Sequence, residues 1–328
     1  MSEHWALRLS GVSKRYRTFT LADVTLDLAA GEVLGLVGTN GSGKTTLLRL
    51  ALGATRPDAG RVEHRAASDG AARRTGDAPW RRDLAFVSSS CAWPRATTPR
   101  EARRLMELSY PGFDPSAFAK RCEELGIAGK LEGTCLGQLS QGAGLALQLA
   151  LALATGARVL LMDEGLSGLD VTARERALGC IQDWMETGER SAIISAHDTR
   201  GLERICDRVA FLAGGRLAAC MSPEAITDEM AVTHLREREL AELAARKPSW
   251  PDRPISEPLV LSRALSTDVL VADRSLLLRE HPTWAQDPAT IDDVLRFLSE
   301  GKPLEGTPLA ADSARTAPQA PNQKGGTP

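Results

Sequence analysis

The sequence predicts an α/β fold with a mainly parallel sheet, followed by a small α+β appendage and a disordered tail. Over the first 220 residues, short apolar segments alternate with helical patterns, which is typical of parallel sheets. One apolar segment runs directly into a glycine-rich loop. The composition then changes near residue 220 and again near residue 304. With 328 residues, at roughly 150 per domain, the chain has room for two domains.

Three apolar segments are expected to form buried strands of the sheet. They are Val33–Val37, Val159–Met162 and Ser191–Ser195. The helix expected after the first of them begins at Thr45, directly after the glycine-rich loop. Residues 209–217 hold a Gly-Gly pair between two apolar runs, which predicts a hairpin. Between Pro94 and Gly137 the pattern turns helical, so we expect a helical subdomain at about residues 94–150.

Residues 1–220 are therefore assigned to the first domain, 221–303 to a small accessory domain and 304–328 to the tail. Ser222 and Pro223 predict a helix start, and the charged segment 224–246 predicts one amphipathic helix. Short strands are expected at 259–261 and 269–271, and a last helix after Thr290. From Gly306 onward, four prolines and three glycines with few large apolar residues predict disorder.

Composition and charge exclude several classes of function. The 40 basic and 42 acidic residues give a net charge of −2, so no nucleic-acid partner is expected. The six cysteines form no CxxC pair, which favours reduced thiols in the cytoplasm. The N-terminus lacks the features of a signal peptide. The most apolar stretch, 145–162, is interrupted by polar residues, so any place at a membrane is expected to depend on a partner.

The segment from Gly38 to Thr45 matches the phosphate-binding pattern GxxxxGK[ST]. Its glycines let successive backbone N–H groups converge on one anion, beside a helix N-terminus. Lys44 would reach the β- and γ-phosphates, and the Thr45 hydroxyl would bind Mg²⁺. The alternative is a glycine-rich turn that contains a lysine by chance. The strand before the loop and the helix after it favour ATP binding, through Gly38, Thr39, Asn40, Gly41, Ser42, Gly43, Lys44, Thr45 and Thr46.

Two carboxylates, Asp163 and Glu164, follow the second buried strand. Open α/β sheets bind their ligands at the carboxyl ends of their strands. Asp163 would hold Mg²⁺ through water, and Glu164 would orient or deprotonate the attacking water. The alternative is a pair of solvated loop acids, which the phosphate loop makes the minor interpretation.

With these segments the chain resembles the ATPase subunit of an ABC transporter, from about Leu7 to Leu217. Four further segments carry the resemblance in the family's order. They are Tyr16, where the family stacks an aromatic ring on adenine; Leu139–Ala143, which is similar to the LSGGQ signature and keeps Ser140 and Gly142; Ser167–Asp170, which is similar to the D-loop; and His197, which matches the switch histidine.

The resemblance implies a head-to-tail dimer that encloses two ATP molecules. Ser140 and Gly142 of one subunit would then face the γ-phosphate on Lys44 of the other, with Asp170 nearby. His197 would contact the γ-phosphate. The helical subdomain would pass the motion to an integral membrane permease, so the chain is expected on the inner face of the cell membrane. Homodimer and heterodimer both stay open.

The chain departs from the family at Ser89, at Gly165, and in the signature, where Gln141 and Ala143 replace Gly and Gln. Ser89 stands where the family usually has a glutamine that reaches Mg²⁺, and the shorter serine would need a bridging water. This predicts either weakened hydrolysis or a tolerated variation. Gly165 replaces the usual proline after Glu164, which predicts a flexible turn and a less firmly aimed carboxylate. Residues 110–114 (YPGFD) resemble bacterial export ATPases that pair with ABC-2-type permeases.

The leading hypothesis is thus an ATP-hydrolysing subunit that energises an exporter. The alternatives are a weakly hydrolysing regulatory subunit of a heterodimer and a non-transport ATPase of the same family. The chain has one phosphate loop, and only 95 residues separate Lys44 from Ser140. Both features favour the transporter subunit, because translation factors usually carry two cores and DNA-repair ATPases a long coiled-coil insertion.

Overall fold

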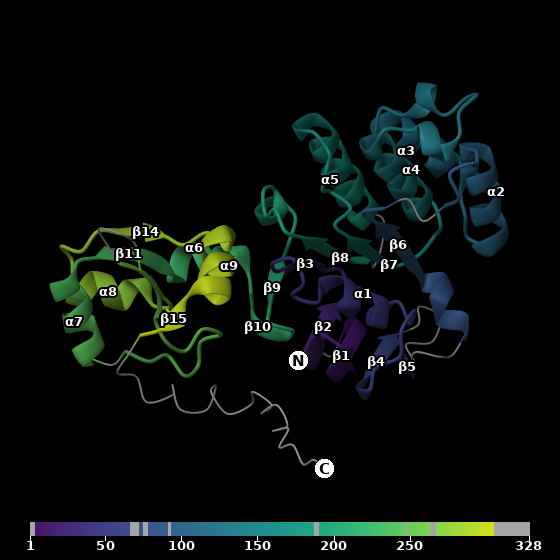
Figure 1. Cartoon of the computed structure of the whole chain (residues 1–328). Helices are drawn as coiled ribbons and strands as arrows, with labels where there is room; N and C mark the ends of the chain where they lie inside the picture. Colours follow the sequence, from purple (N-terminus) through teal and green to yellow (C-terminus); the bar gives the residue numbers. More distant parts are fainter. Residues whose placement is uncertain are drawn as a thin grey trace, which may run out of the picture. The chain divides into compact units, whose positions relative to one another are not determined.

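The computed structural model (Figure 1) describes residues 4–65, 72–74, 78–90, 93–186, 190–246, 248–262 and 267–304. It divides into two compact units. The first comprises Met1–Ile226 with Thr290–Leu295, and the second comprises Thr227–Ala289 with the chain from Arg296 onward. The division at Ile226 lies six residues beyond the boundary expected at residue 220. All but the first residue of the expected disordered tail lies outside the described residues.

The first unit contains the mainly parallel sheet that the sequence predicts. In the described residues it has six strands in the order β10-β9-β3-β8-β7-β6. Only the hairpin partner β10 runs antiparallel. The strands are β3 (Val33–Val37), β6 (Leu84–Ser88), β7 (Val159–Asp163), β8 (Ser191–Ala196), β9 (Arg208–Ala213) and β10 (Arg216–Met221). Every residue of β3, β7 and β8 is buried, as expected of strands covered on both faces.

A second sheet of the same unit, in the order β2-β1-β4-β5, was not predicted. It is antiparallel and comprises β1 (Trp5–Arg15), β2 (Thr20–Ala29), β4 (Ala59–Arg65) and β5 (Ala72–Arg74). Helix α1 (Lys44–Ala51) joins the two sheets into one hydrophobic core, because Leu47, Leu48 and Leu50 belong to the cluster that also contains leucines of both sheets. The phosphate loop is therefore anchored at both ends in this core.

The helical subdomain contains α2 (Pro99–Ser109), α3 (Pro115–Glu124) and α4 (Gln141–Leu153), with short 3-10 turns at Ala128–Lys130 and Leu136–Gln138. Thr98 caps α2 in a capping box with Glu101. Asp114 caps α3 by accepting from the backbone N–H groups of Ser116 and Ala117. The chain then returns to β7, and α5 (Val171–Glu186) follows. The helical pattern expected in this region is confirmed.

The second unit contains an antiparallel sheet in the order β14-β11-β13-β12-β15. Its strands are β11 (Ala231–Leu235), β12 (Leu259–Ser262), β13 (Thr267–Val271), β14 (Gln286–Pro288) and β15 (Lys302–Pro303). The helices that follow β10 in the sequence are α6 (Pro223–Glu229), α7 (Glu237–Arg246), α8 (Arg274–Glu280) and α9 (Ile291–Glu300). Both expected short strands and the helix after Thr290 are confirmed, the latter with a capping box between Thr290 and Asp293.

The single helix predicted over 224–246 is wrong. Strand β11 separates α6 from α7. β11 is central, pairing with β13 on one side and β14 on the other, and four of its five residues are buried. Val232 and Thr233 are β-branched residues that favour such a position. Pairing with strands far along the chain therefore outweighs the helical propensity of the residues on either side.

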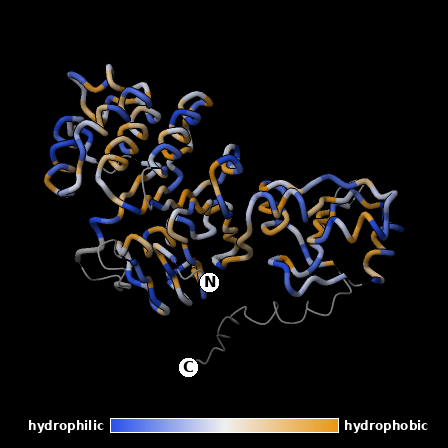
Figure 2. Tube along the Cα trace, turned by 180° about the vertical axis from the view of Figure 1, so that it is seen from behind, coloured by the Kyte–Doolittle hydropathy of each residue, from blue (hydrophilic) through white to orange (hydrophobic). Residues whose placement is uncertain are grey.

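Figure 2 shows hydrophobic stretches that are short and interleaved with polar ones. Within the part of the chain that the structure describes, no helix has both the length and the apolar character needed to cross a bilayer.

Candidate nucleotide-binding site

The phosphate loop connects β3 to α1 and has a backbone that only glycine tolerates at several points. Gly41 and Gly43 have φ values of 82° and 110°, in the left-handed region. A Cβ atom on Gly38 would lie 2.4 Å from Ser42 Oγ. The loop is thus closed tightly before α1 begins, so the glycines of the pattern are explained by its geometry.

Lys44 is buried at the start of α1, and the loop wraps around its side chain. Its Nζ donates to the carbonyl oxygens of Gly38 at 2.8 Å and Thr39 at 3.3 Å. The same atom lies 3.5 Å from Glu164 Oε1. The positive charge is therefore fixed at the helix N-terminus, where the helix dipole also favours an anion.

A hollow opens over this lysine. Its lining residues are Thr18, Phe19, Asn40, Gly41, Gly43, Lys44, Thr45, Thr46 and Glu164. Most of them are residues that the sequence assigns to ATP, whereas Gly38, Thr39 and Ser42 form the loop behind it. The hollow combines one fixed cation with hydroxyl groups and loop backbone, which suits a phosphorylated ligand.

The aromatic ring beside the loop is that of Phe19, and Tyr16 does not line the hollow. Tyr16 N–H donates to Phe19 O at 2.7 Å, in a turn that leaves Tyr16 43% exposed. Phe19 Cζ lies 2.8 Å from the position of a Cβ on Gly43, so the ring rests on the loop. Phe19 lies three residues further along the same segment, and the adenine contact expected of Tyr16 stays a prediction. The sequence could have offered Phe19 as a second candidate.

Thr45 and Asp163, two of the three residues considered as metal ligands, lie together. Thr45 Oγ1 donates to Asp163 Oδ1 at 3.2 Å. Ser195, at the end of the neighbouring strand β8, donates to the same Oδ1 at 3.0 Å and accepts from Glu164 N at 3.0 Å. Ser195 was not among the site residues predicted from the sequence. The only signal was a hydroxyl at the carboxyl end of a buried strand.

This pair of oxygen donors fits Mg²⁺, which binds one or two protein oxygens and fills its shell with phosphates and water. Among the described residues, no group of three His, Cys, Asp or Glu side chains could hold a metal alone. Ser88 is the register partner of Asp163, and Ser89 is the next residue beyond the strand end. The structure thus places Ser89 one residue beyond the partner of Asp163. The ends of β6 and β7, with Ser88, Ser89 and Asp163, are called the metal edge below.

Glu164, which lines the hollow, lies close to His197. Glu164 Oε2 lies 3.7 Å from His197 Nδ1, and that nitrogen lies 3.5 Å from Ser167 Oγ. Glu164 has a φ of 52°, a left-handed conformation that is costly for a residue other than glycine. Its carboxylate therefore lies between Lys44 and His197, so all three residues predicted to be catalytic are brought together.

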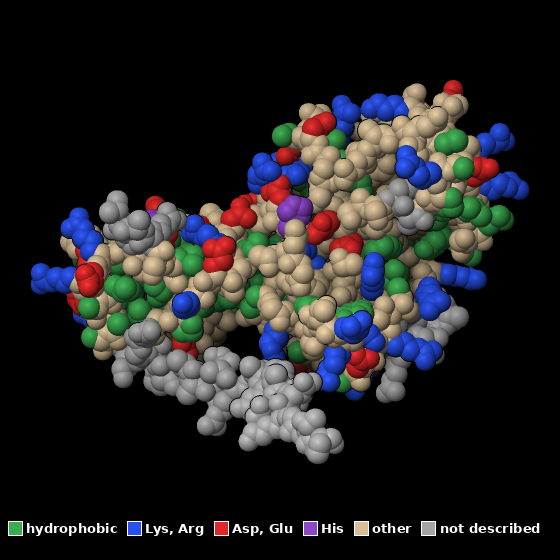
Figure 3. Space-filling model, in the orientation of Figure 1, with side chains coloured by type: hydrophobic (Ala, Val, Ile, Leu, Met, Phe, Trp, Pro, Cys, Tyr) green, Lys and Arg blue, Asp and Glu red, His purple; other side chains and the backbone are tan. Residues whose placement is uncertain are grey.

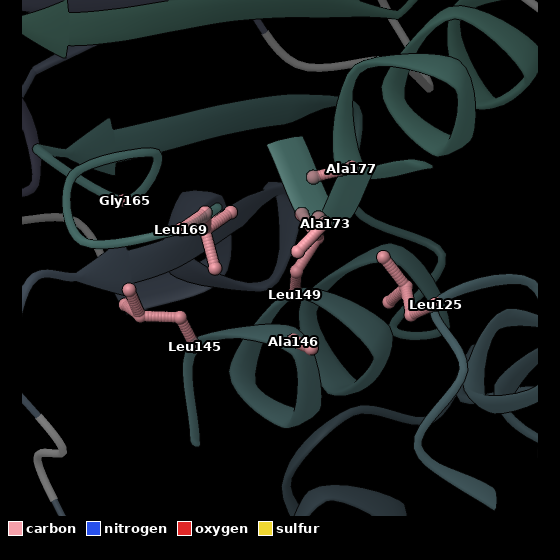
Figure 4. Close-up of a pocket in the computed structure, with 8 residues that line it drawn as sticks. All are labelled: Leu125, Leu145, Ala146, Leu149, Gly165, Leu169, Ala173 and Ala177. Carbon is pink, nitrogen blue, oxygen red and sulfur yellow. The ribbon is translucent and has the colours of Figure 1, made fainter. Parts of the chain in front are cut away.

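Gly165 is needed for close packing rather than for flexibility. A Cβ on Gly165 would lie 2.6 Å from Met162 Cγ and 3.1 Å from Val87 Cγ1. The sequence predicted a loosely aimed Glu164. The structure corrects this expectation, because the packing of Gly165 and the hydrogen bond from Glu164 N–H to Ser195 Oγ hold the residue in place. Figure 4 shows the apolar hollow on which Gly165 borders, lined by Leu125, Leu145, Ala146, Leu149, Leu169, Ala173 and Ala177.

The signature and D-loop residues lie outside the phosphate hollow. Ser140 is exposed and caps α4, because its Oγ accepts from Ala143 N at 3.3 Å. Asp170 is exposed and accepts from Ala173 N at 2.8 Å in the first turn of α5. Gly142 is half-buried, close to Leu169. The structure therefore does not bring Ser140, Gly142 or Asp170 onto this chain's own phosphate loop.

Strand β3 of the parallel sheet runs into this loop, Asp163 ends β7, and Glu164 follows it directly. This arrangement places the chain among the P-loop nucleoside triphosphatases. Comparison with known proteins narrows the class. The family model described as ABC transporter matches residues 21–167. The Nod factor export ATP-binding protein I of Rhizobium sp. (strain N33) is 32% identical over 228 residues, which is 68% of this chain and 73% of that protein. The chain belongs to the ABC transporter family and contains its ATPase domain.

Other relatives are named for different roles. The methionine import ATP-binding protein MetN 2 of Bacillus licheniformis is 31% identical over 222 residues, which is 64% of this chain. The chain spans 64% of that relative's own length, just under two thirds. A solved dimeric ATP-binding cassette in a post-hydrolysis state, bound to ADP and Pi, has a TM-score of 0.57 at 24% identity. The match covers 66% of this chain and 98% of that one, and it confirms the fold.

Proposed function

We propose that this chain binds ATP with Mg²⁺, hydrolyses it, and energises an ABC transporter by ATP-driven dimerisation. The observation that carries the proposal is the position of the Glu164 carboxylate, 3.5 Å from Lys44 Nζ and 3.7 Å from His197 Nδ1, near the Thr45–Asp163 pair. This arrangement offers a cation for phosphates, a carboxylate for water and oxygen ligands for a metal.

In this mechanism the residues act by position and charge. The loop N–H groups and Lys44 hold the β- and γ-phosphates, and Glu164 orients the attacking water and accepts its proton. His197 lies against Glu164 and fixes the geometry at the γ-phosphate. Thr45 and Asp163 would hold Mg²⁺, which would neutralise phosphate charge when bound. Ser195 keeps Asp163 and the backbone of Glu164 in place.

A second copy, or a related subunit, completes the proposed site. Ser140 is exposed at the N-terminus of α4 and does not reach its own phosphate loop, so it is free to face a nucleotide held by another chain. The solved cassette with a similar fold is dimeric by its own description. Both halves of such a composite site are present in this chain, which supports self-pairing and allows a heterodimer.

An exporter of the ABC-2 type is the transporter we favour. The YPGFD segment packs on the sheet, since Tyr110 OH donates to Leu84 O at 3.1 Å and the rings of Phe113 and Phe118 lie 6.2 Å apart. Relatives named for import and for export both match, so this segment supports export within a mixed family. The weakly hydrolysing regulatory subunit is the second candidate, which the serine at position 89 favours.

The permease is proposed to dock on the helical subdomain. Leu105 and Leu108 of α2 are 49% and 74% exposed, and they border a shallow groove with Pro94, Ala96, Thr97, Glu101 and Arg104. Figure 3 shows hydrophobic and basic side chains side by side over α2. An apolar surface rimmed by charge suits a protein partner. Through that partner the chain would lie on the inner face of the cell membrane.

The test is purification of the full chain from the cells that produce it, together with their membranes. ATP hydrolysis by the purified chain, abolished by Lys44→Ala, supports the enzyme. Co-purification of an integral membrane protein that is lost in Leu108→Glu supports the docking site. A chain that binds Mg-ATP no more tightly than Lys44→Ala contradicts the whole proposal.

A further inference from the structure

One polar side chain lies inside the otherwise apolar helix α4. From Ala143 to Leu153 the helix contains only Ala, Leu and Gly apart from Gln148. Gln148 is 8% exposed. A buried amide without a hydrogen bond is costly, so the partner of this side chain is informative.

That partner lies at the metal edge of the sheet. Gln148 Nε2 donates to Ser88 O at 3.4 Å, across 60 positions of sequence. Ser88 ends β6 and is paired in register with Asp163 of β7. The hydroxyl of Ser88 donates in turn to Ser90 O, so the residues on both sides of Ser89 are held. Gln148 is thus bonded to the backbone beside the carboxylate that would hold Mg²⁺.

The same helix carries the exposed signature serine. Ser140 lies eight residues before Gln148, which is about 12 Å along a helix. Leu145 and Leu149 of α4 face the apolar hollow of Figure 4, beside Leu169 of the D-loop. Helix α4 is therefore capped at its start by Ser140, packs beside Leu169 through Leu145 and Leu149, and bonds to Ser88 at the metal edge through Gln148.

We propose that Gln148 is a positioning residue that ties the signature helix to the metal edge through Ser88. The inference rests on the magnesium site proposed above. Position 89, between Ser88 and Ser90, is a serine in this chain, and Gln148 holds the backbone of that segment from the helix. A shift of α4, caused by nucleotide contact at Ser140, would then move the metal edge.

The test compares ATP affinity with and without Mg²⁺ in the full chain. In Gln148→Met, which keeps length and burial but removes the donor, affinity for a fluorescent ATP analogue in EDTA stays within about twofold of wild type. The tightening caused by Mg²⁺ falls about fivefold, the order expected for one buried hydrogen bond. Gln148→Leu is the second variant, and thermal unfolding checks that either variant is folded.

Leu149→Met is the matched control, because it changes the neighbouring residue on α4 and keeps the amide of Gln148 that donates to Ser88. It keeps the full Mg²⁺ effect if the inference is right. A Gln148 variant that is folded and retains the wild-type Mg²⁺ effect overturns the inference. Wild-type protein that shows no Mg²⁺ effect at all overturns the magnesium site itself, and this inference with it.

Discussion

Ser195 Oγ donates to Asp163 Oδ1 at 3.0 Å and also accepts from the backbone N–H of Glu164 at 3.0 Å. One hydroxyl from β8 thus fixes both acidic residues at the end of β7. It holds the carboxylate that faces Thr45 and, at the same time, the strained backbone of the next residue. The aim of Glu164 depends on this bond as well as on its own side-chain contacts.

Ser195→Ala is therefore expected to lower ATP turnover about tenfold, since each bond lost here is worth about 1 kcal/mol or more. ATP affinity in EDTA should change little, because the phosphate loop is untouched. Ser191→Ala is the matched control. Ser191 is also buried on β8, but its Oγ donates to Ala29 O at the opposite end of the strand. Equal turnover losses in both variants would assign the effect of Ser195 to stability alone.

Glu164→Gln should slow ATP hydrolysis by at least about a hundredfold, because an amide cannot accept the proton of the attacking water. ATP binding should be preserved, since Lys44 keeps its bonds to Gly38 and Thr39. Single-turnover phosphate release and equilibrium ATP binding measure the two effects separately. Glu175→Gln, which loses only an exposed ion pair with Arg204, is the control. Normal phosphate release from Glu164→Gln would remove the proposed base.

The sequence predicted the phosphate loop and the acidic pair because each is a local pattern beside a strongly apolar strand. Ser195 was missed because its role comes from the pairing of β7 with β8. Phe19 was missed for a similar reason, since its ring lies against Gly43 of another segment. Interactions between distant segments decide these features, and no window of sequence contains both partners.

The same limit explains the broken helix in the second unit. Residues 224–246 are rich in helix-forming side chains, yet β11 forms within them because two distant strands pair with it. Glycine at 165 was interpreted as flexibility, whereas Met162 and Val87 leave no space for a Cβ there. Local propensity is thus a good guide where packing agrees with it and a poor one where packing decides.

A further ion pair links α5 to the residue that follows His197. Arg174 of α5 donates to Asp198 at 3.2 Å, and Asp198 follows His197 directly. Hydrogen bonds from the Arg200 guanidinium, with the charge of Arg174 adding to them, hold the pKa of Asp198 well below its usual range. Asp198 is therefore charged at neutral pH, and it can anchor the His197 loop to α5.

Arg174→Asp and Asp198→Arg should each lower turnover about tenfold, with the KM for ATP within about twofold of wild type, because His197 is misplaced while the phosphate loop is intact. The double variant restores an opposite pair and should recover part of the loss. Steady-state kinetics of the four proteins checks this. Arg200→Ala, at an exposed side chain that also bonds Asp198, should have the smaller effect. A double variant as slow as the product of the single effects would refute the coupling.

The second unit contains a pH-dependent contact between three strands. His234 Nδ1 of β11 lies 2.7 Å from Asp268 Oδ1 of β13, and its Nε2 lies 3.4 Å from Asp287 of β14. The hydrogen bond to Asp268, whose side chain is buried, raises the pKa of His234 above its usual value. Because the folded pKa exceeds the unfolded value of about 6.5, the stabilisation is complete below that pH and is lost as pH rises through the folded pKa.

His234→Gln should therefore destabilise the protein at pH 5.5 and have little effect at pH 8.5. The ring is 40% exposed, so solvent screening keeps the difference at or below about 1 kcal/mol. Urea unfolding at several pH values, followed by the circular dichroism of the full chain, measures it. Since Asp287 is exposed and Asp268 is buried, Asp287→Asn should remove only a small part of the pH dependence of stability. Asp268→Asn should remove most of it. If the difference in unfolding free energy between wild type and His234→Gln grew with rising pH, the assigned sign would be wrong.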